Sequence, residues 1–152
     1  MTTVTIEQIQ AKQSELASMI AQLLAAPTVV PTTIQIEETI ELAPGEHYAG
    51  LTTKPDGTHC AVVLLPGTGT DLTWTKAKAW AEEQGGELPS RPVAALLFAN
   101  CKPHLQPRWH WSCEEFDASF AWYCGFLRGN QNGCRKSYEG SAVAVRQIPL
   151  TA

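Results

Sequence analysis

The stretch covering residues 109–146 constrains the fold of this chain more than any other part of its sequence. Tryptophan, tyrosine and phenylalanine recur there at short intervals, between polar segments that glycine interrupts. Large aromatic side chains supply the buried area that a small sheet needs, and glycine suits the turns between short strands. We therefore expect a small sheet that holds irregular loops rigidly at one surface, which is typical of recognition rather than of catalysis.

The length of 152 residues accommodates one globular domain with a short appendage. The net charge is −4, and residues 101–152 carry six Lys or Arg against four acidic residues. This small surplus falls far short of the clustered basic footprint of nucleic-acid binders. No apolar run reaches the length of a membrane span and no secretory signal begins the chain. We expect no nucleic-acid partner, no membrane insertion and synthesis in a host cytoplasm.

Five cysteines, an odd number without a secretory signal, favour free thiols over a disulfide framework. A zinc site would combine Cys113, Cys124 and Cys134 with a histidine (His59, His104 or His110), but no cysteine pair has the short spacing of structural zinc sites. No base and orienting group accompany a cysteine in a pattern typical of a nucleophile. We expect neither a metal nor another cofactor, and a cysteine-dependent enzyme is the alternative from a different functional class.

The amino-terminal segment carries a heptad pattern over nearly three repeats. Its a and d positions are Ile6, Ile9, Gln13, Leu16, Ile20 and Leu23. This pattern predicts a helix over about residues 5–25, and such a helix alone in water is marginal because its apolar stripe stays wet. We interpret residues 1–26 as an oligomerisation helix, with a homotrimer as the expected assembly, although the pattern suits two strands or more. The alternative is an amphipathic helix docked on its own domain.

Residues 27–44 read as a linker followed by a first strand. Pro27 and Pro31 end the helix, and residues 26–33 form a short stiff connector. The alternation of Ile34, Ile36, Ile40 and Leu42 predicts a half-buried strand or a tight pair of strands.

The remaining residues, 45–152, predict an α+β domain. The turn sequence at 54–57 joins residues 47–53 to the apolar run 60–65 in a hairpin. Residues 66–70 are interpreted as a plain turn, because they lack the lysine and the hydroxyl residue that end a phosphate-binding loop. Asp71 or Thr73 caps a helix that runs through Trp74, Ala77, Trp80 and Ala81 to the glycines at 85–86.

Ser90 caps a second helix, with Pro92 in its first turn and a buried stripe made of Ala95, Leu96, Phe98 and Ala99. Further strands are expected at 109–113, 120–127 and 141–148, with a turn at 128–133. The sequence thus predicts a small, mostly antiparallel sheet with two short helices.

Several motifs together resemble a known family. They are Trp-Thr-Lys-Ala-Lys-Ala-Trp-Ala (74–81), Gly-Gly-Glu-Leu-Pro-Ser-Arg (85–91), Leu-Leu-Phe-Ala-Asn (96–100), Trp-His-Trp-Ser (109–112), Ala-Trp (121–122), Gly-Asn (129–130), Lys-Ser-Tyr (136–138) and Ala-Val-Arg (144–146). This set is similar to the Lcl C-terminal (collagen-like adhesin) domain family of phage and bacterial proteins, over roughly residues 45–148. The resemblance implies a C-type-lectin-like fold and a ligand-binding module without catalytic activity.

Similar domains are the variable proteins of diversity-generating retroelements, in which scattered positions vary on a fixed scaffold. Carried over by motif, the resemblance implies scaffold roles for Trp109, Trp111, Ala121, Trp122, Phe126, Gly129 and Arg146. It implies a displayed, ligand-binding set of His110, Glu114, Cys124, Leu127, Arg128, Asn132, Gly133, Cys134 and Arg135. Calcium-dependent sugar binding is not expected, because the required run of oxygen ligands is missing.

Other residues have two interpretations each. Trp109 and Trp111 share one side of a strand, either as core, which we favour, or as an aromatic platform. Arg128, Arg135 and Lys136 either meet an acidic glycan or anionic protein patch or lie on a solvated turn. Arg91 and Arg146 are expected as buried or half-buried members of ion pairs rather than as ligand contacts.

The sequence therefore predicts a noncatalytic binding protein of phage or prophage origin, located in the virion as a tail or surface component. Its expected partner is a host surface protein or glycan, or another virion protein. A capsid-decorating structural protein is the alternative among binding proteins.

Overall fold

The computed structural model describes residues 3–25, 27 and 38–151. They belong to two units, within residues 1–34 and 35–152. The first contains α1 (Ile6–Ala25), which confirms the expected amino-terminal helix. Thr5 and Gln8 exchange hydrogen bonds at its start, from Gln8 N to Thr5 Oγ1 (3.3 Å) and from Thr5 N to Gln8 Oε1 (3.1 Å). This reciprocal capping satisfies amide groups that the first turn leaves unpaired.

The predicted strand over residues 34–42 is wrong where it is described, because Ile40 and Leu42 lie outside any strand. Ile34, Ile36 and the connector apart from Pro27 fall outside the described residues. No described helix is long and apolar enough to cross a membrane.

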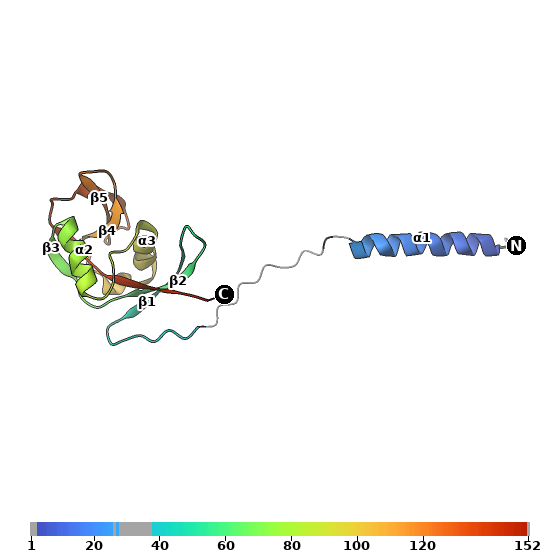
Figure 1. Cartoon of the computed structure of the whole chain (residues 1–152), viewed down its shortest axis with the longest axis horizontal. Helices are drawn as coiled ribbons and strands as arrows, with labels where there is room; N and C mark the ends of the chain where they lie inside the picture. Colours follow the sequence, from blue (N-terminus) through green and yellow to red (C-terminus); the bar gives the residue numbers. More distant parts are fainter. Residues whose placement is uncertain (1–2, 26, 28–37, 152) are drawn as a thin grey trace. The chain divides into compact units, whose positions relative to one another are not determined.

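The second unit contains a three-stranded antiparallel sheet in the order β1-β2-β8, which combines its first two strands with its last (Figure 1). Its strands are β1 (His47–Thr53), β2 (His59–Leu64) and β8 (Val145–Pro149). The predicted hairpin is confirmed, since β1 pairs with β2 and the Lys54 amide donates to the Thr58 carbonyl (2.8 Å). Every residue of the central strand β2 from Cys60 to Leu64 is buried, which implies that both faces of the strand are covered.

A five-stranded sheet in the order β3-β7-β4-β5-β6 makes up the other layer. Its strands are β3 (Gly69–Leu72), β4 (Trp109–Glu115), β5 (Phe120–Gly125), β6 (Gln131–Arg135) and β7 (Gly140–Ala142). All neighbours are antiparallel except β4 and β7. The predicted turn at 128–133 is wrong in its second half, because residues 131–133 belong to β6 and pair with β5. The expected strand 141–148 divides into β7 and β8.

Both short helices are confirmed. α2 (Trp74–Glu83) begins after Thr73, but the Thr73 side chain makes no capping hydrogen bond. α3 (Arg91–Asn100) begins after Ser90, whose hydroxyl accepts from the Val93 amide (3.4 Å). A 3-10 turn, η1 (Lys102–His104), follows. The predicted buried stripe of α3 is wrong: Val93, Ala94 and Leu97 are buried, whereas Ala95 and Ala99 are exposed and Leu96 and Phe98 are partly buried. Helical spacing fits either stripe, and the packing partners decide between them.

Two apolar clusters form the core of this unit. One joins α3 to the three-stranded sheet and to Phe126; the other joins α2 to the large sheet around Trp111. Trp111 is fully buried, and its indole Nε1 donates to the Leu72 carbonyl (2.8 Å). Trp109 is partly buried against it, with ring centroids 5.0 Å apart. The interpretation of the two tryptophans as core is therefore confirmed.

Candidate functional site

Two members of the predicted displayed set are inside the protein. His110 and Cys124 are each 1% exposed and pair with each other across β4 and β5. The His110 ring lies 4.8 Å from the Phe126 ring, and Cys124 belongs to the core cluster below α3. Their prediction as surface contacts is wrong, because this face of the strand pair packs against the core.

Two further members have structural contacts. A Glu114 carboxylate oxygen, Oε2, accepts from the Arg91 amide at the first turn of α3. A carboxylate at this position stabilises the unpaired amides of a helix start. Cys134 is half-buried and packs against the second core cluster. Neither side chain is free to be displayed as the sequence predicted.

The other predicted residues do not form one patch. Leu127 is 57% exposed and lies with the exposed Arg128 in the turn between β5 and β6. Arg135 pairs with Phe120 at the opposite end of the same hairpin. Arg135 lies four residue steps along β6 from Gln131, or about 13 Å at the usual rise. A small ligand therefore contacts one end of the hairpin or the other.

One face of the β5–β6 hairpin carries a group of aromatic rings between two arginines. We call Arg91, Phe116, Phe120, Trp122 and Arg135 the aromatic surface. Alternation along β5 places Phe120 and Trp122 on one face, and Phe116 joins them at a centroid distance of 4.8 Å from Trp122 and 6.4 Å from Phe120. Arg91 lies over the Trp122 ring at 3.6 Å, and Arg135 lies over the Phe120 ring at 5.9 Å.

Phe116 is the most accessible aromatic ring of this surface, at 51% exposed. It rests over Gly133 of the edge strand β6, where an added Cβ would lie 2.9 Å from the ring. Gly133 was predicted as a ligand contact, but its missing side chain instead leaves space for the exposed Phe116 ring. The neighbouring Asn132 is exposed, and its Oδ1 accepts from the Gly133 amide (2.8 Å).

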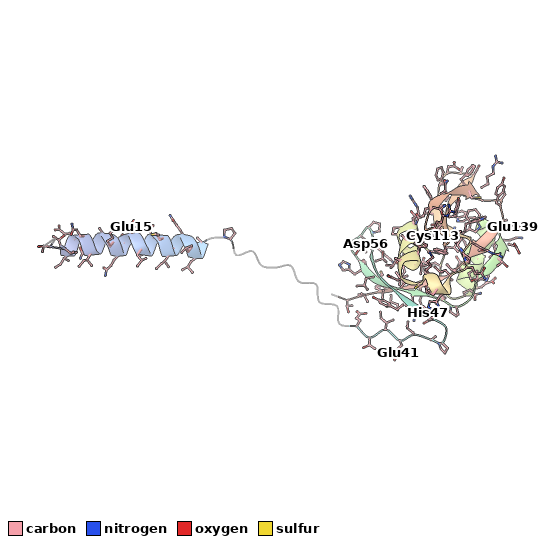
Figure 2. All side chains as sticks on the ribbon, turned by 180° about the vertical axis from the view of Figure 1, so that it is seen from behind. Glu15, Glu41, His47, Asp56, Cys113 and Glu139 are labelled. Atoms are coloured by element: carbon pink, nitrogen blue, oxygen red, sulfur yellow. The ribbon has the colours of Figure 1, made fainter. Side chains whose placement is uncertain are left out.

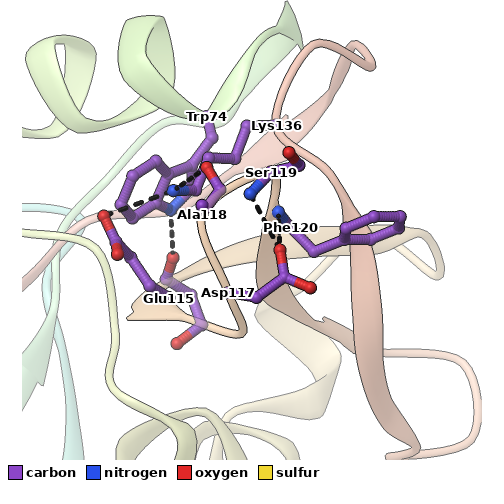
Figure 3. Close-up of polar contacts among 8 residues, drawn as sticks. Trp74, Glu115, Asp117, Ala118, Ser119, Phe120 and Lys136 are labelled. Atoms are coloured by element: carbon purple, nitrogen blue, oxygen red, sulfur yellow. Dashed lines mark hydrogen bonds and ion pairs between the residues drawn. The ribbon is translucent and has the colours of Figure 1, made fainter.

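Lys136 contacts the loop between β4 and β5 (Figure 3). Its Nζ donates to the Ala118 carbonyl (3.0 Å), pairs with Glu115 Oε1 (3.3 Å) and lies 4.7 Å from the Trp74 ring centroid. In the same loop, Asp117 Oδ1 accepts from the amides of Ser119 and Phe120, both at 2.8 Å. These bonds order the loop that presents Phe116.

An open hollow of about 480 Å³ adjoins the aromatic surface. It is lined by Ala118, Ser119, Phe120, Arg135, Lys136 and Ser137. Backbone bonds from the Lys136 amide to Ser119 O (2.9 Å) and from the Trp74 amide to Lys136 O (3.1 Å) join its walls to α2. Two of the lining residues, Ser119 and Lys136, are thus bonded to each other and to the start of α2.

The expected ion pairs are confirmed for one arginine only. Arg146 Nη2 lies 2.8 Å from Glu46 Oε2, and its Nε donates to Glu46 Oε1 (3.0 Å). The hydrogen bonds from Arg146 lower the pKa of the Glu46 carboxyl below its ordinary value. Arg91 has no acidic partner for its guanidinium among the described residues.

Four of the five cysteines lie in surroundings that disfavour the thiolate form. All five are free thiols. Burial raises the pKa of the thiols of Cys101, Cys113, Cys124 and Cys134, which reduces the thiolate needed for nucleophilic attack or metal binding. Within residues 3–25, 27 and 38–151, no three His, Cys, Asp or Glu side chains gather as a metal-binding group.

Sequence reasoning missed Phe116 and Phe120 and assigned Trp122 to the scaffold. Strand alternation was the signal that places Phe120 and Trp122 on one face. No local signal connects them to Arg91, which is 31 positions away from Trp122 in the sequence.

No model of a known protein family matches the chain, and no curated protein matches it. The α+β arrangement of two sheets, two short helices and a long amino-terminal helix is established by the structure itself. A function for the chain therefore has to be argued from the aromatic surface and from α1.

Proposed function

We propose that the chain is a noncatalytic ligand-binding protein of a phage or prophage, in which a C-type-lectin-like scaffold presents the aromatic surface to a host receptor. The observation that carries this proposal is a half-exposed ring, Phe116, beside Trp122 and two arginines at the edge of a sheet. Aromatic residues and arginine contribute most of the binding energy at protein interfaces. The proposed location is a virion tail or surface, in line with the family resemblance of the sequence motifs.

The order of the surface before binding supports this function. Asp117 and Lys136 hold the loop behind Phe116 through hydrogen bonds of 2.8 to 3.0 Å. Stacking on Trp122 holds Arg91 in one position. A binding site whose side chains are already ordered loses less conformational entropy when the ligand arrives, so a small surface of this kind is sufficient for specific recognition.

The amino-terminal helix supports presentation of several copies together. Its side chains project on all sides (Figure 2), and Ile6, Leu16 and Leu23 are 74%, 58% and 76% exposed. Copies of α1 that pack through this stripe would remove it from water. We propose a homotrimer, in which linked sites raise the overall avidity by about 10² to 10⁴ over a single site.

Binding is tested with the fluorescent full-length protein on arrays of bacterial surface glycans and of bacterial surface proteins. We expect saturable binding to one class of spot that Phe116→Ala abolishes and that Arg128→Lys, at the other end of the hairpin, leaves unchanged. Arrays without any spot that depends on Phe116 would refute receptor binding through this surface. If the chain is instead found bound to capsids, with its aromatic surface packed against a capsid subunit, the capsid-decorating alternative is supported.

Assembly is tested by light scattering of the full chain and of a truncated chain that begins at Thr33. We expect three chains per particle for the full chain and one for the truncated chain. Equal masses per chain in the two samples would refute assembly through α1. Serine in place of Cys113, Cys124 and Cys134 should leave array binding within a few fold, whereas a cysteine-dependent enzyme would lose its activity.

A further inference from the structure

The guanidinium of Arg91 is held from two directions. Its Cζ atom lies over the Trp122 ring, 3.6 Å from the ring centroid. Its Nε donates to Gln131 Oε1 (3.0 Å), and Gln131 Nε2 in turn donates to the Arg91 carbonyl (2.8 Å). Two bonds to one glutamine fix both the backbone and the head of the side chain. Arg91 therefore has one orientation without any ligand.

This arrangement leaves one edge of the guanidinium without a partner. Nη1 and Nη2 make no hydrogen bond or ion pair with any described residue, although Nε is bonded. The nearby Glu114 carboxylate accepts from the Arg91 backbone amide instead. Arg91 is only half-buried, so its free edge is open to a ligand. Two parallel N–H donors on a planar, always charged group match the two oxygens of a carboxylate.

We infer that Arg91 binds a carboxylate of an acidic protein segment, and that an apolar side chain of the same segment packs on Phe116. This inference rests on the proposed function and names its ligand class. Arg135, exposed over the Phe120 ring at 5.9 Å, places a second positive charge on the same surface. Two arginines beside three aromatic rings give the surface the charge and composition that complement an acidic segment with an apolar residue.

The geometry of the rings favours a protein segment over an acidic sugar. A sugar ring stacks on an open, flat aromatic face, but Arg91 covers a face of Trp122. The Phe116 ring is tilted by 53° to Trp122 and by 57° to Phe120, so the three rings do not form a flat platform. Tilted rings instead leave recesses that suit a branched or aromatic side chain.

The test uses full-length, ¹⁵N-labelled protein and two probe peptides, acetyl-Phe-Glu-Phe-amide and its twin with glutamine in the centre. The side-chain signals of Arg91 Nε and Trp122 Nε1 report binding by NMR. We expect the glutamate peptide to bind with a Kd of about 1 mM, as suits a small fragment, and the glutamine twin to bind about tenfold more weakly. Glucuronate serves as the sugar carboxylate.

Arg91→Lys should weaken binding of the glutamate peptide about tenfold, because lysine lacks the bidentate fork. Arg128→Lys is the matched control and should change nothing. Phe116→Ala, at a half-exposed position, is the second variant and should weaken both peptides equally. Each variant is required to keep the thermal unfolding midpoint of the native sequence. If Arg91→Lys lowers this midpoint, the inference is judged from Phe116→Ala and from the difference in affinity between the glutamate and glutamine peptides.

Equal binding of the two peptides, or binding that Arg91→Lys leaves intact, would overturn the inference. Glucuronate that binds more tightly than the glutamate peptide would also overturn it, in favour of an acidic sugar, while the proposed receptor-binding function would stand. If no probe shifts the NMR signals, and if no array spot loses binding in Phe116→Ala, both the inference and the proposed function are refuted.

Discussion

The buried histidine of β4 makes the stability of this protein depend on pH. His110 is 1% exposed, its Nδ1 bonds to the Arg108 carbonyl (2.9 Å), and its Nε2 has no hydrogen-bond partner among the described residues. Burial lowers the pKa of His110 to about 4; the hydrogen bond to Arg108 opposes this, and the charge of Arg108 adds to it. The folded protein thus holds His110 neutral at a pH where the unfolded chain binds a proton.

The magnitude follows from the two pKa values. An ordinary histidine in the unfolded chain has a pKa near 6.5, and each unit of difference from the folded value is worth about 1.4 kcal/mol. Stability falls as the pH drops from about 6.5 to 4, because only the unfolded state takes up the proton in this range. The expected loss of unfolding free energy is roughly 2 to 3 kcal/mol by pH 4.5, and about 3 kcal/mol when complete.

The assay is urea unfolding from pH 7.5 to 4.5, at one protein concentration because the chain is proposed to assemble. We compare the unfolding free energy of the native sequence with that of His110→Gln, which has similar volume and no proton to gain. In this variant the unfolding free energy should no longer show the part of its decline with falling pH that comes from His110. His104→Gln, at an exposed position, is the control and should retain the decline.

Carboxylates belong to a lower pH range and cancel in this comparison. Hydrogen bonds lower the pKa of Glu46, so its contribution is present above the ordinary carboxyl pKa and is lost as the pH falls further. The native sequence and both variants share that loss. Parallel free-energy curves for the native sequence and His110→Gln between pH 7.5 and 4.5 would refute the reasoning about burial.

Three further predictions concern the sheet, the loop and the helix. Gly140→Ala should destabilise the domain by about 1 to 3 kcal/mol in urea unfolding, because its Cβ would overlap the Trp109 ring; an unchanged midpoint would contradict this packing. Lys136→Met should cost about 1 kcal/mol or less, yet limited proteolysis within residues 116–119 should become several-fold faster, and equal cleavage rates would argue against its role in the loop. Gln13→Ile should raise the thermal midpoint of the proposed oligomer by removing the polar a position, and a lower midpoint would place Gln13 outside the seam.

The candidate site was only partly predictable from the sequence. Arg135 was expected at the surface and lies there, and Trp111 was expected in the core and is fully buried. His110 and Cys124 were expected to face a ligand, but the core packs against their side of the strand pair. Sequence motifs indicate positions along a strand, whereas exposure depends on which layer covers each face.

Local signals in the sequence determined α1, α2, α3 and the hairpin of β1 and β2. Capping residues such as Thr5 and Ser90 and the turn at Lys54 act through neighbours a few positions away, so their effect is readable without the fold. The tertiary structure alone decided the buried face of α3, the strand β6 and the meeting of Arg91 with Trp122. These features depend on residues distant in the chain, whose proximity arises only when the sheets and helices pack together.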